Sequence, residues 1–260
     1  MKIGVFDSGL GGLGAVGELS RLCPSLDIVY FGDTARLPYG TRSKEAVCRY
    51  AAQDAAFLLD KQVDAILIAC GTASSAALPE LAEKVSVPVF GVVEPAAREA
   101  VKSTKNAKIA VLGTQGTVAS GAYERAIHAV LPEAEVVSVA CPMLVPIVEN
   151  GEAGTALCRL ALEQYLSAPR AAGCDTVLLG CTHYPLLSED IRALWSGVTL
   201  VDAGAAAARA LASLVKNEGM GRVELFTSDF SQGFFEIAER FLPGGKAHFA
   251  RERVLVEQWN

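Results

Sequence analysis

The sequence predicts an α/β protein built from two pseudo-symmetric, doubly wound parallel-sheet domains with the active site between them. Short apolar runs alternate with longer segments of helical spacing, which is the pattern of parallel sheets covered by helices. Two of these runs resemble each other closely and end in a cysteine, and the segments around them recur in the same order in the second half. The repeated order indicates that one α/β unit occurs twice.

The expected elements follow from the spacing of apolar residues. Continuous apolar runs are typical of parallel strands that are buried on both faces, and recurrence at three and four residues is typical of helices. Two segments have clear helical spacing, Ser43–Asp60 and Gly154–Ser167. Eight runs are candidate strands: Ile3–Phe6, Ile28–Phe31, Ala65–Ala69, Val89–Val92, Ile109–Leu112, Val136–Val139, Val177–Leu179 and Thr199–Val201.

The tail of the chain lies beyond the second repeat. Its segment Val223–Ser228 has the pattern of a strand, and Gly233–Phe241 has the pattern of a helix. We expect this tail to return and pack on the first half. The first domain is therefore predicted at residues 1–95 plus 206–260, and the second at residues 96–205.

Composition excludes several classes of protein. Of the 260 residues, 51% are apolar and 20% charged, which is an ordinary globular composition. The net charge is −6 and no block of Lys or Arg occurs, which argues against nucleic-acid binding. No uninterrupted apolar stretch is long enough to predict a membrane span. Asp7 and nearby glycines interrupt the N-terminal apolar run, so no signal peptide is predicted and we expect a cytoplasmic protein.

The cysteines and histidines do not predict a metal site or a disulfide framework. The seven cysteines are an odd number, and no Cys-x-x-Cys pair is present. The three histidines are scattered, so we expect free thiols and no bound metal. Four of the thiols are expected to be small buried hydrophobic side chains, namely Cys23, Cys48, Cys158 and Cys174.

The two matching segments each carry a candidate catalytic thiol. The first runs from Asp64 to Cys70-Gly71-Thr72, and the second from Asp175 to Cys181-Thr182-His183. Open α/β sheets bind ligands at the carboxyl ends of their strands, so both thiols are expected in a site. Residues suited to a helix start follow Cys70, and their N–H groups are expected to lower its pKa.

Two thiols on opposite sides of one ligand suit inversion of a carbon centre. Racemisation removes a proton from one face of Cα and returns one to the other, so one group acts as base and its opposite as acid. The carbanion between these steps needs hydrogen-bond donors at the substrate carboxylate. No Lys stands in a recognisable pyridoxal-phosphate motif, which favours a route without cofactor. The available donors are Ser8, Thr72, Thr114, Thr117 and Thr182.

Two further segments supply candidate site residues. Asp7 and Ser8 precede a glycine-rich turn whose N–H groups favour an anion, and the spacing fits a carboxylate better than a dinucleotide. Asp7 is expected to accept a bond from an ammonium or to orient a thiol, the alternative being a cap on the turn. Tyr39 stands between Pro38 and Gly40 and is expected either to form a wall of the site or to pack in the core.

These residues resemble the glutamate racemase family, within the aspartate/glutamate racemase superfamily. The similarity extends over nearly the whole chain and is most specific in the loop Tyr30–Thr41 and in the segment Gly180–Leu187. Further matches are Gly4-Val-Phe-Asp-Ser-Gly-Leu-Gly-Gly-Leu, Gly91-Val-Val-Glu-Pro, Val111-Leu-Gly-Thr and Ser120-Gly-Ala-Tyr.

The resemblance implies a cofactor-independent, two-base enzyme that interconverts L- and D-glutamate for peptidoglycan synthesis. It implies that Cys70 and Cys181 are the acid/bases, assisted by Asp7, Glu149 and His183. The alternatives are a solvated carboxylate at the end of a helix for Glu149 and a packed or capping imidazole for His183. A cytoplasmic homodimer is also implied. Substrate contacts are expected from Asp7, Ser8, Pro38, Tyr39, Gly40, Gly71, Thr72, Thr114, Thr117, Thr182 and His183.

One position departs from the family pattern. The first cysteine motif of the family usually reads Cys-Asn-Thr, and the Asn contacts the substrate, whereas this chain has Gly71. The loss of a neutral hydrogen bond costs about 0.5–1.5 kcal/mol, and glycine loosens the backbone beside the thiol. Two other hypotheses therefore stand beside a glutamate racemase: a related racemase with shifted amino-acid preference, and a catalytically weak relative that binds a ligand.

Overall fold

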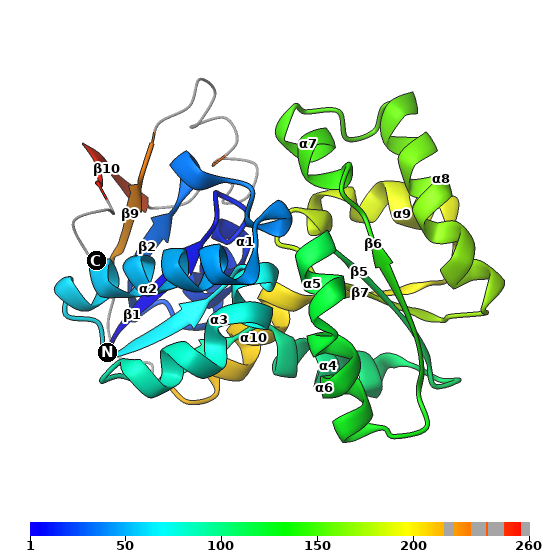
Figure 1. Ribbon diagram of the computed structural model, residues 1–260, viewed down its shortest axis with the longest axis horizontal. Coiled ribbons are helices and arrows are strands. Elements are labelled where there is room, and N and C mark those ends of the chain that lie inside the picture. The colour runs from blue at the N-terminus through cyan, green and yellow to red at the C-terminus, as the bar shows by residue number, and fades with distance from the viewer. Residues whose placement is uncertain (216–220, 230–237, 239–246, 256–260) are drawn as a thin grey trace.

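The computed structural model describes residues 1–215, 221–229, 238 and 247–255 of the chain. Among these residues lie two parallel sheets, one in each half of the molecule (Figure 1). The first sheet has the strand order β10-β9-β2-β1-β3-β4, and the second has the order β6-β5-β7-β8. Helices connect the strands in both halves, so the predicted α/β class is confirmed.

The eight predicted strands are confirmed, with bounds that differ by at most one residue at either end. They are β1 Lys2–Asp7, β2 Asp27–Gly32, β3 Ala65–Ile68, β4 Val89–Gly91, β5 Lys108–Gly113, β6 Glu135–Ala140, β7 Thr176–Leu179 and β8 Thr199–Asp202. The order β2-β1-β3-β4 in one sheet corresponds to β6-β5-β7-β8 in the other, with every pair parallel. The two halves therefore share one topology, as the repeat predicted.

The tail of the chain returns to the first half. Strand β9 (Val223–Thr227) pairs with β2, as expected for this segment. Beside β9 lies β10 (Ala247–Arg253), which the sequence analysis missed because its residues Ala-His-Phe-Ala-Arg-Glu-Arg are largely polar. Charged residues are common on strands at the edge of a sheet, where β10 lies. The helix predicted over 233–241 lies outside the described residues apart from position 238.

Capping residues set the starts of the two helices that the sequence predicted most clearly. Ser43 caps α2 by accepting a hydrogen bond from Ala46 N at 3.2 Å, and Thr155 caps α8 by accepting one from Cys158 N at 3.3 Å. Helix α8 continues four residues beyond its expected end and includes Pro169. Among residues 1–215 the α-helices are α1 Leu13–Leu22, α2 Lys44–Asp60, α3 Gly71–Lys84, α4 Val93–Ser103, α5 Gln115–Ser120, α6 Ala122–Val130, α7 Leu144–Glu149, α8 Ala156–Ala171, α9 Ser188–Leu194 and α10 Ala203–Ala212.

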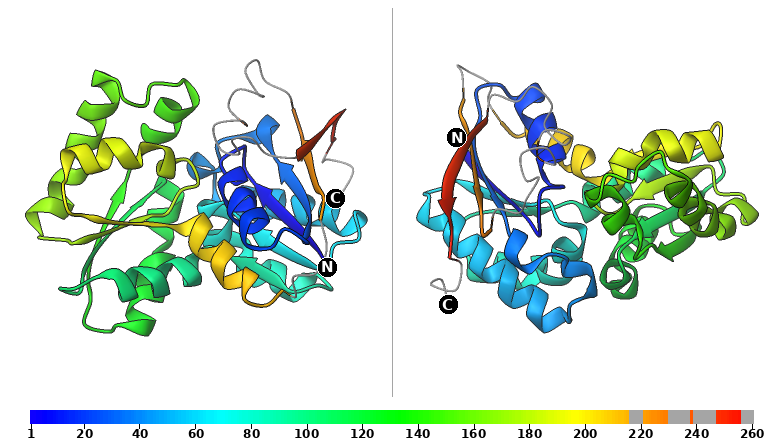
Figure 2. Two further views of the ribbon diagram at one scale, coloured as in Figure 1. Left: turned by 180° about the vertical axis from the view of Figure 1, so that it is seen from behind. Right: turned by 90° about the horizontal axis from the view of Figure 1, so that it is seen from above.

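The chain passes between the two halves through α4 and α10, and these helices join the halves. Figure 2 shows the halves side by side from behind and from above. Helix α10 packs on α1 and α4. The Arg209 guanidinium on α10 pairs with Glu99 on α4 and reaches Glu18 on α1 at 3.4 Å. One cluster of buried apolar side chains runs from β1 through α4 and α10 to β5 and β7. The halves therefore share a core.

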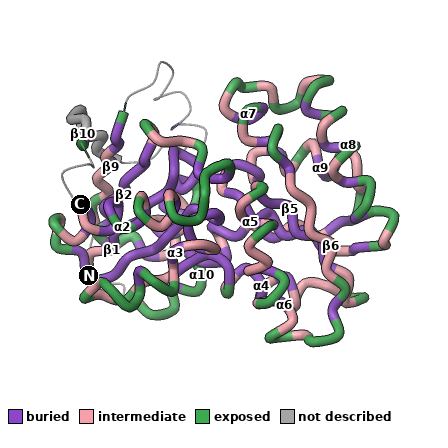
Figure 3. The backbone as a smooth tube through the Cα atoms, in the orientation of Figure 1, coloured by how far each residue is buried: buried purple, intermediate pink, exposed green. Residues whose placement is uncertain are grey.

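Burial is greatest at the central strands of both sheets. Strands β3 and β7 are buried along their whole length, and β1 and β5 are buried after their first residue. Figure 3 shows this buried centre in each half. No helix in the described part of the chain is both long and apolar enough to cross a membrane.

Asp64 and Asp175 precede β3 and β7, the strands that lead to the two thiols. Both aspartates accept hydrogen bonds from the backbone at or before the start of the neighbouring strand. Asp64 accepts a hydrogen bond from Lys2 N at 2.7 Å, at the start of the neighbouring strand β1. Asp175 accepts bonds from Lys105 N at 2.7 Å and Asn106 N at 3.1 Å, just before the neighbouring strand β5. Each carboxylate therefore sets the register of two adjacent strands, and Asp175 does so with more bonds.

We expect Asp175→Ala to lower the free energy of unfolding by about 1–2 kcal/mol, because it removes several hydrogen bonds to a carboxylate. Asp64→Ala is the matched control, and its loss is expected to be smaller because its carboxylate accepts a single backbone bond. Urea unfolding at neutral pH measures both. An equal or larger loss for Asp64→Ala would contradict this explanation of the repeated aspartates.

Candidate active site

The two repeated cysteines lie at equivalent places in the two sheets. Cys70 follows the carboxyl end of β3 and Cys181 follows that of β7, each separated from its strand by one residue. Both side chains line one cavity between the halves. The sheet edge at which parallel strands end is the usual ligand site of such folds, so the geometry brings two thiols to one candidate ligand site.

The Cys70 thiol is buried at the start of α3. Its Sγ accepts a hydrogen bond from Ala73 N at 3.4 Å and lies 3.7 Å from Ser8 Oγ. Burial raises the pKa of this thiol to about 12, and the nearby Asp7 carboxylate adds to the shift. We expected N–H groups at the helix start to lower the pKa of Cys70, and the hydrogen bond from Ala73 N does act in that direction. The loss of solvent outweighs it, so the expectation of a lowered pKa is wrong for the net shift.

The Cys181 thiol lies beside an imidazole that a carboxylate supports. Its Sγ is 3.8 Å from His183 Nδ1, and His183 Nε2 is 2.9 Å from Glu149 Oε1. Burial opposes the charged form of His183, but the bonds to Cys181 and Glu149 outweigh it and raise the pKa to about 10. At neutral pH the ring is therefore an imidazolium that donates to the sulfur on one side and to the carboxylate on the other.

Asp7 lies at the carboxyl end of β1, between the environments of the two thiols. Its carboxylate accepts hydrogen bonds from Gly9 N at 3.1 Å and from Thr182 Oγ1 at 3.3 Å. Burial raises the pKa of Asp7, against the opposing effects of His183 and the hydrogen bonds. Asp7 thus caps the glycine-rich turn, as the alternative to a catalytic role predicted. It also contacts Thr182, in the motif that carries the second thiol.

A cluster of three hydroxyl groups spans the two halves above the cavity. Thr72, on α3, lies 2.9 Å from Thr114 and 3.3 Å from Thr117, measured between the Oγ1 atoms. The last two lie 3.0 Å apart, at the start of α5. The cluster therefore offers hydroxyl donors beside two helix N-termini, a suitable environment for a carboxylate.

The structure brings the predicted site residues together. The inner cavity, with a free volume of about 20 Å³, is lined by Ser8, Pro38, Tyr39, Gly40, Cys70, Gly71, Thr72, Thr114, Cys181, Thr182 and His183, and by Leu37 and Val145, which the sequence analysis missed. Asp7, Thr117 and Glu149 do not line it but bond to residues that do. Leu37 directly precedes Pro38, and Val145 lies four residues before Glu149 on α7. Both are apolar, and no chemical pattern distinguishes them.

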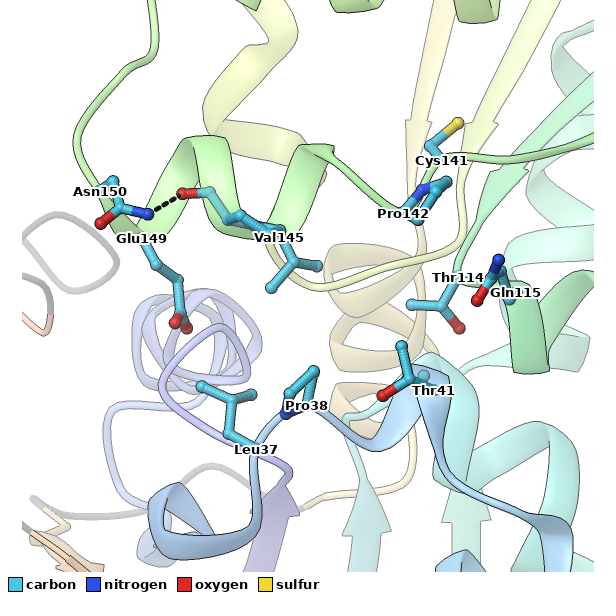
Figure 4. A pocket seen from close by; sticks show the side chains of 12 residues that line it. Leu37, Pro38, Thr41, Thr114, Gln115, Cys141, Pro142, Val145, Glu149 and Asn150 are labelled. Carbon is cyan, nitrogen blue, oxygen red and sulfur yellow. Dashed lines mark hydrogen bonds between the residues drawn. The ribbon is translucent and has the colours of Figure 1, made fainter.

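A larger pocket opens beside this cavity and shares part of its wall. It has a volume of about 430 Å³, and Leu37, Pro38, Gly40, Thr114 and Val145 line both spaces. Figure 4 shows its two sides, with Leu37, Pro38 and Thr41 facing the segment from Pro142 to Asn150 and the Glu149 carboxylate directed into the space between them. The pocket is thus the outer part of the same site, and most of its lining was not predicted.

A buried ionic network lies beneath the loop that forms one wall of the cavity. The Arg36 side chain bonds to Asp33 at 2.5 Å, to Asp54 at 3.0 Å and to Gln53. Ser228, after β9, donates to the other oxygen of Asp33 at 2.8 Å. Both carboxylates are fully buried, so the network fixes the loop between β2 and α2 to the sheet below.

The hydroxyl of Tyr39 joins this network and does not point to the ligand space. It lies within hydrogen-bond distance of both Asp33 and Asp54. A phenol has one proton to donate, so one of the two carboxyl groups must itself donate to the phenol oxygen. Burial, with the negative charge of Asp33, raises the pKa of Asp54 well above its usual value. We assign that proton to Asp54, and Tyr39 therefore positions the Pro38–Gly40 wall from behind.

The remaining titratable groups form no metal site within the described residues, where no cluster of three or more His, Cys, Asp or Glu side chains has the arrangement of a metal site. All seven cysteines are free thiols. Cys23, Cys158 and Cys174 are buried as expected, whereas Cys48 is only partly buried.

Comparisons with known proteins agree with this geometry. The family model for Asp/Glu/hydantoin racemase matches residues 18–211. The chain is 46% identical over 242 residues to a glutamate racemase of Aquifex aeolicus, which covers 93% of this chain and 94% of that protein. A crystal structure of the Francisella tularensis glutamate racemase in complex with D-glutamate is 34% identical, with a TM-score of 0.91 and coverage of 99% and 98%. The Thermus thermophilus glutamate racemase in complex with beta-chloro-D-alanine is 43% identical, with a TM-score of 0.86 and coverage of 99% and 98%.

We expect Arg36→Leu to lower the free energy of unfolding by about 3–5 kcal/mol, because it leaves a buried carboxylate without its cation. Lys84→Ala is the control, since Lys84 pairs with Glu80 on an exposed helix face, where such pairs contribute little. Chemical denaturation at neutral pH measures both variants. A loss at Arg36 no larger than that at Lys84 would show that the network does not support the loop.

We expect both ring nitrogens of His183 to carry protons at pH 8. Nitrogen-15 NMR of the imidazole signals tests this, with His183→Asn assigning the resonance. The folded-state pKa of about 10 lies above the unfolded value of 6.5, so the stability that this proton contributes is complete below pH 6.5. It is lost as the pH rises toward 10. A His183 signal that titrates near pH 6.5 would contradict the assignment.

Proposed function

Because the chain belongs to the Asp/Glu/hydantoin racemase family, we propose that it interconverts L- and D-glutamate by a two-base reaction at Cys70 and Cys181. The chain is an amino-acid isomerase of the glutamate racemase group, as its relatives at high coverage show. The observation that carries the two-base proposal is the presence of two thiols, from equivalent strands of two similar sheets, in the lining of one cavity.

In the proposed reaction a thiolate on one side takes the proton from Cα, and the thiol on the other side gives its proton to the opposite face. The product is the mirror image, and the two sulfur atoms have exchanged their protonation states. The carbanion between these steps is stabilised by donors aimed at the substrate carboxylate. We assign this contact to Thr72, Thr114 and Thr117, with Ser8 and Thr182 at the neighbouring positions.

The two thiols have different surroundings in the free protein. Cys70 keeps its proton at neutral pH, because burial and Asp7 raise its pKa to about 12. The imidazolium of His183 stands beside Cys181, with its Nδ1 atom 3.8 Å from the sulfur. We propose that Cys181 is the base and Cys70 the acid at rest. Glu149 holds the imidazolium in place, and Asp7 holds the proton on Cys70.

The remaining functional assignments rest on the relatives and on the chemistry of the site. Glutamate is the proposed substrate, since the Francisella tularensis relative binds D-glutamate. No cofactor is proposed, because the two thiols supply both the acid and the base. We further propose a cytoplasmic homodimer that makes D-glutamate for peptidoglycan and so for cell shape. The domain limits at 95 and 205 stay a prediction, supported by the return of β9 to the first sheet.

The two other hypotheses, which the glycine at position 71 suggested, predict different results in a racemisation assay. A racemase of another amino acid would exchange and invert that amino acid, and a ligand-binding relative would invert none. The named relatives support neither hypothesis, since the curated proteins similar to this chain are glutamate racemases.

We expect the purified protein, without added cofactor, to racemise L- and D-glutamate in deuterated water and to place deuterium at Cα of the product. Cys70→Ala and Cys181→Ala are each expected to lower kcat by about 10²–10⁴-fold, the usual contribution of a general acid or base. Polarimetry and proton NMR measure the two effects.

Cys48→Ala is the matched control, because this thiol is partly buried and lies outside the cavity, bonded to Ala76 O. It should keep full activity. No exchange with either enantiomer of glutamate or aspartate would overturn the proposed activity. Full activity of Cys70→Ala or Cys181→Ala would exclude the two-thiol mechanism alone.

A further inference from the structure

Glycines of the first half meet threonines of the second half around the cavity. A Cβ built on Gly11 would lie 2.5 Å from Thr182 Oγ1, and one built on Gly40 would lie 2.5 Å from Thr114 Cβ. Real Cβ atoms essentially never come within 3.0 Å of a neighbour. The halves therefore approach each other here more closely than residues with side chains would allow, although a threonine side chain is able to rotate away.

Gly71 makes the closest of these approaches, and it meets the backbone. A Cβ built on Gly71 would lie 2.0 Å from the carbonyl oxygen of Gly180, which cannot rotate away. Gly180 is itself held from behind: a Cβ on it would lie 2.9 Å from Tyr123 Cε2 and 3.0 Å from Leu112 O. A side chain at position 71 would therefore have to push the end of β7, together with its half of the molecule, away from α3.

This contact joins the chain neighbours of the two proposed catalytic thiols. Gly71 directly follows Cys70 in the chain, and Gly180 directly precedes Cys181. A separation of the two glycines consequently separates the backbones that carry the sulfur atoms. The inner cavity has a free volume of about 20 Å³, room for on the order of one water.

We infer that Gly71 sets the spacing of the two thiols, because its missing side chain lets the Gly180 carbonyl pack against it. The inference rests on the proposed two-thiol racemisation and adds to it a residue that determines the geometry. The carbonyl fills the space in which an Asn of the family pattern would begin. Glycine at position 71, in place of the family's Asn, therefore lets the two halves pack more closely. The positions of the two thiols depend on this close packing.

The hydroxyl of Tyr123 supports this view of the contact. Tyr123 is buried and its hydroxyl has no hydrogen-bond partner among the described residues. It lies 3.8 Å from the place that a Cβ on Gly71 would take. A polar side chain at position 71 would have a group to bond there, yet the chain has glycine and leaves a buried donor unpaired. The glycine allows the close approach of the Gly180 carbonyl, and the cost is that the Tyr123 hydroxyl stays without a partner.

The backbone itself does not require glycine at this position. Gly71 is the first residue of α3 and is absent from the residues with positive φ. Alanine favours helices more than glycine does, so Gly71→Ala is compatible with the local structure. A loss of activity in this variant is therefore attributable to the contact with Gly180.

The test compares Gly71→Ala and Gly71→Asn with Gly14→Ala, whose added Cβ would meet no atom within 4 Å. We expect kcat to fall about 100-fold in both Gly71 variants, the loss that a 1 Å misplacement causes, with a smaller change in KM. Gly14→Ala should leave kcat unchanged. Circular dichroism and thermal melting of each variant establish that the fold is kept.

A second readout distinguishes thiol spacing from general damage. When the opposite thiol lies too far away, the first thiol returns a proton to the face it came from, after exchange with solvent. In deuterated water, the ratio of deuterium in unconverted glutamate to inverted product should therefore rise in Gly71→Ala. A protein that is merely less folded would lose exchange and inversion together, with the ratio unchanged.

Three outcomes would overturn the inference. One is a kcat of Gly71→Asn equal to or above that of the original protein, which would show that an Asn amide at this position assists the reaction. Another is kcat of Gly71→Ala within twofold of the original. The third is a crystal structure of Gly71→Ala in which the distance between the two sulfur atoms is unchanged, a result that does not depend on activity. Failure of the unaltered protein to racemise glutamate would instead overturn the proposed function.

Discussion

The close approach of two parallel sheets, at the edges where β3 and β7 end, is the constraint on which the site depends. It brings Cys70 and Cys181 into one cavity, and it joins Thr72 to Thr114 across the halves. It also removes the groups around the cavity from water, which raises the pKa of both Asp7 and Cys70. Helices α4 and α10 maintain the approach, because one hydrophobic core runs through them from sheet to sheet.

The two halves share a topology but not an electrostatic environment. Cys70 has Ser8 and the Asp7 carboxylate nearby, and Cys181 has the His183 imidazolium supported by Glu149. A repeated fold thus gives its two thiols different neighbours, a carboxylate beside Cys70 and an imidazolium beside Cys181. The proposed racemisation needs one thiol and one thiolate at the start of each turnover, and the two exchange roles as the proton leaves one face of Cα and another arrives at the opposite face.

A buried ionic network outside the cavity supports the Pro38–Gly40 wall of the candidate site. Arg36 joins the buried carboxylate of Asp33 to the protonated carboxyl group of Asp54, and Tyr39 extends the network to the wall at Pro38–Gly40. Buried ion pairs contribute little to net stability but are costly to break. Their value here is positional, because one cation and one shared proton hold a loop in a single arrangement beneath the site.

The sequence by itself determined the strands, the repeat and the chemical residues. Apolar runs such as Ala65–Ala69 and Val177–Leu179 indicate buried strands. The matching motifs after them singled out Cys70 and Cys181 by pattern alone, whereas the role of His183 came from the family resemblance. The sequence did not yield β10, whose polar residues resemble a loop, nor Leu37 and Val145, which have no distinguishing chemistry. Only the tertiary structure decided the pKa of Cys70, the partners of Tyr39 and the contact of Gly71 with Gly180. Each of these depends on solvent exclusion or on distances between segments far apart in the chain, and local sequence carries neither.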